Sequence, residues 1–169
     1  MITVDRLKLE VRIRILIITF IVFLILSGIT AFPLETELKF LVDATTSAPE
    51  FLHEWLQNVY QAIKETNAKF PFMSYGTDWL AFAHIVIAVV FIGPLRDPVR
   101  NVWVIQFGMI ACLMIFPLAF ICGPIRQIPF YWQLIDCSFG VIGFLPLYQC
   151  YRYIRKLEIL LANTNLKFI

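Results

Sequence analysis

Three ionisable side chains fall inside long apolar runs of the sequence: Asp78, His84 and Asp136. An ionisable group within a membrane span is costly to bury and is a functional candidate for that reason. At about 1.5 Å per helical residue, His84 would lie about 12 Å and Asp136 about 9 Å from the same end of their spans. The sequence therefore predicts that these two side chains meet at one depth. Asp78 would lie only about 3 Å inside its span, close to water.

Two neighbouring polar residues would extend this group into a pocket that opens outward. Gln133 lies one helical turn above Asp136, and Arg126 lies in the adjoining loop. A carboxylate beside an imidazole favours the charged histidine and orients its proton, which is suited to ligand binding or proton transfer. The alternative is a hydrogen-bonded pair that holds two membrane helices together, with a stabilisation of about 0.6 kcal/mol. Both interpretations stay open.

The sequence predicts no metal site and no cofactor. A tetrahedral metal site would need His84 and Asp136 with Cys137 or Cys122, and their spacing carries no ligand signature. The only other histidine, His53, lies in a polar segment, so haem held by two histidines is not expected. No Gly-rich phosphate loop, G-x-S-x-G elbow, H-E-x-x-H helix or EF-hand loop is present. These observations favour a protein that is not an enzyme.

A second group of residues lies in the stiff turn RDPVRN at 96–101. Its arginines, with two that follow the last apolar run, form a candidate contact for an anionic headgroup or a phosphorylated ligand. These four residues are Arg96, Arg100, Arg152 and Arg155. The alternative is a hairpin that only sets the orientation, in which Asp97 caps the following helix.

The composition places all these residues in a membrane protein. The chain of 169 residues is 60% hydrophobic and 15% charged, with a mean hydropathy of +0.78, whereas soluble domains are about 45–50% apolar and about 25% charged. About 20 apolar helical residues cross a hydrocarbon core of about 30 Å. Four predicted spans cover about 15–32, 76–92, 102–122 and 130–151. We expect an all-α integral membrane four-helix bundle forming one domain over 1–169.

The first apolar run, Ile15 to Phe32, follows the short basic segment Met1 to Arg14. A secretory signal peptide has the same order of basic and apolar parts, but its apolar part has only about 7–15 residues. The longer run predicts a retained anchor.

The segment 34–74 is the only long polar part and is expected to be helical. Ser47-Ala48-Pro49-Glu50 has the form of a capping box at a helix start. The apolar residues behind it recur at helical spacing, which indicates an amphipathic helix. They are Phe51, Leu52, Trp55, Leu56, Val59 and Ile63. This extra helix is predicted to pack on the outer, periplasmic end of the bundle and to present Glu50, Glu54 and Lys64 to a membrane-protein partner.

The distribution of basic residues predicts the orientation, because Lys and Arg flanking the spans are retained in the cytoplasm. Ten of the 14 would lie on one side: Arg6, Lys8, Arg12, Arg14, Arg96, Arg100, Arg152, Arg155, Lys156 and Lys167. The other side would hold Lys39, Lys64, Lys69 and Arg126. Both termini are therefore predicted to be cytoplasmic, in a bacterial inner membrane. No basic stripe lies clear of the spans, so we expect no nucleic-acid partner.

Three stretches resemble a small family of uncharacterised inner-membrane proteins of Bacteroidetes-type bacteria. They are SYGTDWLAFAH at 74–84, GPLRDPVRN at 93–101 and WQLIDCSFG at 132–140. The resemblance covers roughly the last two-thirds of the chain and implies no activity. The architecture is also similar to that of the EXPERA group, sterol isomerases and sterol-binding receptors with four or five spans. No motif of that group matches residue by residue, so none of its catalytic positions is carried over.

Two functional hypotheses follow from these features. The first is an accessory or assembly subunit of an envelope complex, favoured by the absence of reaction motifs and by the outer helix. The second is a membrane protein that binds a lipid or a small apolar ligand, with or without catalysis, through the pocket of Asp78, His84 and Asp136. In both hypotheses the surrounding solvent is the lipid bilayer.

Overall fold

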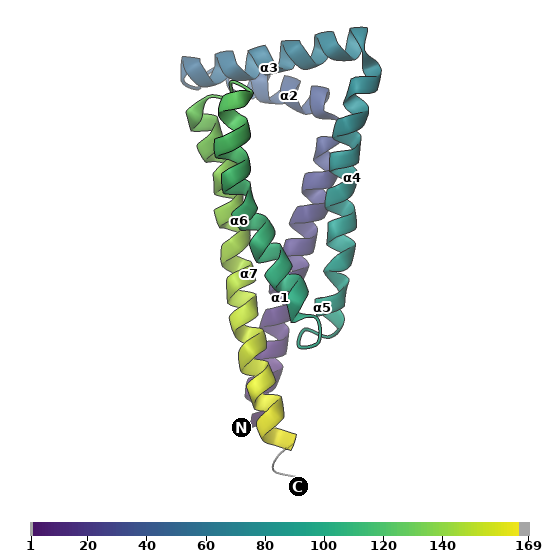
Figure 1. Cartoon of the computed structure of the whole chain (residues 1–169), viewed down its shortest axis with the longest axis vertical. Helices are drawn as coiled ribbons and strands as arrows, with labels where there is room; N and C mark the ends of the chain where they lie inside the picture. Colours follow the sequence, from purple (N-terminus) through teal and green to yellow (C-terminus); the bar gives the residue numbers. More distant parts are fainter. Residues whose placement is uncertain (1, 166–169) are drawn as a thin grey trace. The chain divides into compact units, whose positions relative to one another are not determined.

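The computed structural model describes the backbone of residues 2–165 and the side chains of residues 6–163. Within this part the chain is helical and contains no strand, which confirms the all-α prediction. The elements in order are α1 (Ile2–Ala31), α2 (Leu34–Ala44), α3 (Glu50–Lys69), the 3₁₀ turn η1 (Pro71–Ser74), α4 (Tyr75–Val90), α5 (Ile92–Arg96), α6 (Val102–Ile125) and α7 (Phe130–Asn165) (Figure 1). Lys167, counted above among the cytoplasmic residues, lies outside the described residues.

Within the described residues, four helical segments are long and apolar enough to cross a membrane: Arg6–Ala31, Pro71–Arg96, Val102–Ile125 and Phe130–Asn163. The last three contain their predicted spans, and the first begins before its predicted span and ends one residue before the predicted end at 32. A helix that satisfies its own backbone hydrogen bonds need not stop where the apolar run stops. Large apolar side chains on these helices stay exposed, among them Leu118 at 62% and Ile142 at 65%. Such a surface is typical of a multi-pass membrane protein.

The contacts along the chain divide it into two compact units. One comprises the described residues of Met1–Val22 and Val89–Ile169, and the other comprises Phe23–Ala88. The first part of α1 thus belongs to one unit and its last part to the other. The single domain over 1–169 stays a prediction.

In the first unit, α6 packs against α7 (Figure 1). A Cβ atom added at Gly140 would lie 2.7 Å from the backbone oxygen of Cys112, and one at Gly143 would lie 2.9 Å from Cys112 Sγ. Any larger residue at these positions would push the two helices apart. Small residues at these positions thus allow the two helices to approach closely, as is common between membrane helices.

The first part of α1 packs within the same unit. Ile13 and Ile17 are buried, and the Phe20 ring lies 4.7 Å from the Phe91 ring between centroids. The Arg12 guanidinium lies 5.8 Å from the centre of the Tyr153 ring, a cation–π contact of the kind that holds an arginine near a helix end. These contacts position the basic start of α1 close to the end of α7.

In the second unit, the last part of α1 packs against α4. A Cβ atom at Gly28 would lie 2.8 Å from the backbone oxygen of Ala81, so the two helices approach closely at this point. α2 and α3 run beside each other (Figure 1), with Leu38, Val42 and Leu56 buried. This arrangement places the start of α2, the end of α3 and the start of α4 around one small region.

The predicted capping box at the start of α3 is wrong. The N-cap residue is Pro49 instead of Ser47, and no side chain caps the helix. Pro49 has an extended backbone (φ −53°, ψ 136°), and its carbonyl oxygen accepts hydrogen bonds from the amides of Leu52 and His53. Because the proline fixes where the chain turns into the helix, Ser47 is left two residues outside it.

The close packing of α6 on α7 predicts an asymmetry between two glycines. Gly140→Ala should lower the free energy of unfolding by about 1–3 kcal/mol, because the added methyl meets the Cys112 backbone, which cannot move aside. Gly76→Ala is the matched control, since a Cβ there meets nothing within 4 Å. Thermal unfolding in detergent measures both variants. Equal loss of stability in the two variants would contradict this packing.

Candidate binding site

The structure places the intramembrane residues of the sequence analysis in different units. Asp78 and His84 belong to the second unit, and Asp136 belongs to the first. The proposed pairing of His84 with Asp136 stays a prediction. Asp136 is half-buried in α7.

His84 makes a hydrogen bond within its own helix. Its Nδ1 atom lies 2.8 Å from the carbonyl oxygen of Leu80. Because a carbonyl oxygen only accepts hydrogen bonds, Nδ1 carries the proton, and Nε2 of a neutral ring is an acceptor. The ring is thus held by the backbone one turn earlier.

Gln133 and Arg126 lie at the turn between α6 and α7. Gln133 is 4% exposed and its Nε2 donates a hydrogen bond to the carbonyl oxygen of Ile128 at 2.8 Å. A Cβ atom at Gly123 would lie 2.6 Å from Gln133 Cδ, so this glycine makes room for the amide. Gln133 therefore closes the turn, while the Arg126 side chain is exposed.

The turn at 96–101 lines a cavity of about 540 Å³ in the first unit. We call it the arginine cavity. Its basic residues are Arg6, Arg14, Arg96 and Arg100, and its acidic residues are Glu10 and Asp97. Its apolar residues are Pro98, Val99, Leu157 and Leu161. The lining thus combines an excess of positive charge with an apolar wall.

The turn that carries Arg96 and Arg100 is held by side chain to backbone hydrogen bonds. Asn101 Nδ2 donates to the carbonyl oxygens of Gly93 at 3.2 Å and Asp97 at 2.9 Å. Asp97 Oδ1 accepts a hydrogen bond from the Arg100 amide at 3.0 Å. The prediction that Asp97 caps the helix after the turn is wrong, since the N-cap residue of α6 is Asn101. The Asp97 carboxylate is bonded within the turn itself.

The partners of this turn differ from those expected. Arg6 and Arg14, from the first part of α1, line the cavity with it, whereas Arg152 and Arg155 are not among its lining residues. Both of these are exposed on α7, and Arg155 Nη1 binds Glu158 Oε2 at 2.6 Å. The distribution of basic residues predicts that all these arginines lie on one side of the membrane. It does not predict which helix end lies beside the turn at 96–101.

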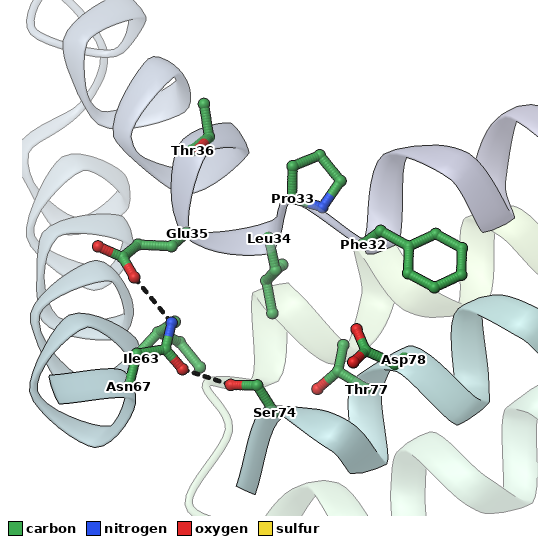
Figure 2. Close-up of a pocket in the computed structure, with 10 residues that line it drawn as sticks. All are labelled: Phe32, Pro33, Leu34, Glu35, Thr36, Ile63, Asn67, Ser74, Thr77 and Asp78. Carbon is green, nitrogen blue, oxygen red and sulfur yellow. Dashed lines mark hydrogen bonds between the residues drawn. The ribbon is translucent and has the colours of Figure 1, made fainter. Parts of the chain in front are cut away.

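A smaller hollow of about 100 Å³ lies in the second unit, where α2, α3 and α4 approach one another (Figure 2). Asn67 Nδ2 donates a hydrogen bond to Glu35 Oε2 at 2.7 Å, and the Ser74 hydroxyl donates one to Asn67 Oδ1. On the other side of the hollow Figure 2 shows Asp78, Thr77 and Phe32. Sequence reasoning selected Asp78 but missed Glu35, which it had assigned only to the polar segment.

Within the described residues, no group of three or more His, Cys, Asp or Glu side chains could hold a metal ion. Comparison of the chain with protein-family models, curated proteins and solved structures finds no match. The resemblance to inner-membrane proteins of Bacteroidetes-type bacteria therefore stays a hypothesis, and the function has to be argued from the residues.

Proposed function

We propose that this chain is a multi-pass inner-membrane protein that binds a phosphate-bearing anionic lipid in the arginine cavity. The observation that supports the proposal is the lining of that cavity, in which four arginines face two carboxylates beside an apolar wall. The His84 and Asp136 pocket is not needed for this function and stays a separate hypothesis.

The charge of the cavity favours an anion, because both of its carboxylates already have partners. Glu10 Oε1 lies 2.8 Å from Arg6 Nε, and Asp97 accepts from the Arg100 amide. In the part of the chain that the structure describes, Arg14, Arg96 and Arg100 form no ion pair. Their guanidinium groups are available for phosphate oxygens, which arginine binds with two parallel hydrogen bonds.

The apolar part of the lining favours an anion that carries a hydrocarbon chain. Leu157 is 2% exposed and lines the cavity together with Val99 and Leu161. A volume of about 540 Å³ falls within the range of about 300–1,000 Å³ typical of small-molecule sites. A headgroup with the first part of its acyl chains would match both kinds of lining.

The predicted orientation supports the same ligand. With both termini cytoplasmic, the basic start of α1 and the turn at 96–101 would lie at the inner leaflet, whose anionic lipids attract basic residues near the surface. The arginines would then meet their ligand laterally from the membrane, without a path through the bilayer.

A second candidate function, an accessory subunit of an envelope complex, is supported by the surface of α3. Glu50, Glu54 and Lys64 are exposed, and Phe51 is 55% exposed. If α3 is the amphipathic outer helix, this surface would face a partner in the periplasm.

The accessory hypothesis predicts a specific partner contact at α3. A photocrosslinking residue placed at Glu54 should capture one protein in intact cells, and the same residue at Gly76, where the surroundings are open, should not. Equal capture at both positions, or none at either, would contradict a docking role for α3.

The lipid-binding proposal predicts that two arginines act through the cavity. The double variant Arg96→Gln, Arg100→Gln should weaken binding of phosphatidylglycerol by about 30-fold, because each basic residue near the surface contributes about 1 kcal/mol. Native mass spectrometry with lipid titration measures the affinity. Inorganic phosphate should compete weakly, because it lacks the chain that contacts Leu157 and Leu161.

The matched control for this experiment removes the same charge outside the cavity. In the double variant Arg152→Gln, Arg155→Gln, the affinity should change little, because neither residue lines the cavity and Arg155 is already paired with Glu158. If both double variants weaken binding to the same extent, net charge alone attracts the lipid and the cavity has no role.

A further inference from the structure

Besides the arginine cavity, the second unit contains a hollow of about 310 Å³ with the opposite character. Four aromatic rings and one carboxylate line it: Phe32, Tyr75, Trp79, Phe82 and Asp78. We call it the aromatic hollow. It adjoins the smaller hollow of Figure 2, since Phe32 and Asp78 line both. No lysine or arginine is among the residues that line either one.

The rings stand at steep angles to one another and are well exposed. The Trp79 ring lies 6.0 Å from the Tyr75 ring at an interplanar angle of 79° and 6.0 Å from the Phe82 ring at 87°. In such edge-to-face pairs the edge of one ring meets part of a face of the other, and no two rings are stacked in parallel. The side chains of Tyr75, Trp79 and Phe82 are all more than half exposed. A cation is attracted to the exposed part of a ring face by the ring quadrupole.

The carboxylate in this hollow has no partner of its own. In the part of the chain that the structure describes, Asp78 forms neither a hydrogen bond nor an ion pair, and it is half-buried beside the rings. By contrast Glu35, on the far side of the adjoining hollow, accepts from Asn67. A half-buried carboxylate favours a positive charge close to it, because its own charge is only partly solvated.

We infer that the aromatic hollow binds an alkylammonium group, with Asp78 opposite the charge and the ring faces of Tyr75, Trp79 and Phe82 against its methyl or methylene groups. Aromatic faces together with a carboxylate recognise an organic ammonium better than a metal ion, because a bare metal ion requires several oxygen ligands. The ligand class is set by the lining itself and does not depend on the proposed function of the arginine cavity, which lies in the other unit.

The test uses the full-length protein in phosphatidylglycerol nanodiscs, with tetramethylammonium as the probe and ligand-observed NMR as the readout. Tetramethylammonium should bind, and the uncharged isostere tert-butanol should not displace it. Asp78→Asn should weaken binding at least tenfold. Asp78→Glu should retain binding within about threefold, because the charge is kept. Trp79→Leu should weaken binding several-fold, because the apolar wall remains but the strongest cation–π face is lost.

Two matched controls separate the hollow from general surface effects. Asp43→Asn removes an exposed carboxylate in the same unit, and Trp103→Leu removes a tryptophan that is 57% exposed, as Trp79 is. Neither should change binding more than twofold. The inference is overturned if tert-butanol competes equally, if Asp78→Asn binds as the unchanged protein does, or if the control variants lose binding to the same extent as Asp78→Asn and Trp79→Leu.

A second arm identifies the source of the ammonium group. In nanodiscs of phosphatidylethanolamine, whose headgroup carries an ammonium, a membrane-derived ligand already occupies the hollow. Binding is compared with that of Asp78→Asn in the same lipid, which cancels the attraction of the cation to an anionic surface, and this ratio should fall at least threefold relative to phosphatidylglycerol. An unchanged ratio in the two lipids assigns the hollow to a soluble amine. Both results support an alkylammonium site, whereas absence of tetramethylammonium binding in both lipids overturns it.

Discussion

The long helices with apolar outer surfaces are the constraint on which the rest of this structure depends. In the part of the chain that the structure describes, four helical segments are long and apolar enough to cross a membrane, and apolar side chains such as Leu118 and Ile142 stay mostly exposed on them. In such surroundings a polar side chain must find a partner within the protein or lie near a helix end. His84 and Gln133 have such a partner, since each forms a hydrogen bond with a backbone carbonyl oxygen.

Two sets of charged side chains lie near helix ends, a mainly basic set in the first unit and an acidic set in the second. The arginine cavity forms where the start of α1, the turn at 96–101 and the end of α7 contribute lining residues. The aromatic hollow and its smaller neighbour form around the end of α1 and the start of α4. Because the charges in each set are mostly of one sign, each set is a candidate site for a ligand of the opposite charge. The two proposals depend on separate residues and can fail independently.

Hydropathy predicted the helices well because it depends on sums over about 20 residues, which single side chains hardly change. The local caps were predicted poorly because each depends on one or two hydrogen bonds. The N-cap residue of α3 is Pro49 instead of Ser47, and Asp97 accepts the Arg100 amide within its own turn instead of capping α6. The fixed φ of proline suits the turn into a helix, and a side-chain oxygen nearby in the sequence does not ensure that it caps that helix.

The candidate site was predictable only in part, for a related reason. The sequence identified Arg96, Arg100 and Asp78, because arginines at a stiff turn and an acid near a span boundary are visible without tertiary structure. The partners Arg6, Arg14 and Glu35 were not predicted. Which helix ends lie next to one another depends on helix packing, and no local sequence pattern encodes it. Close contacts such as Gly140 on Cys112 fix that packing, and the sequence shows only that the residue is small.

The proposed functions require the turn at 96–101 to lie on the cytoplasmic side of the membrane and helix α3 to lie on the opposite side. Single-cysteine variants Asn58→Cys and Arg100→Cys, in a chain whose four cysteines are replaced by serine, can be treated in intact cells with a membrane-impermeant maleimide. The account predicts labelling at position 58 in intact cells and labelling at position 100 only after permeabilisation. Labelling of both positions in intact cells, or of position 100 alone, would contradict it.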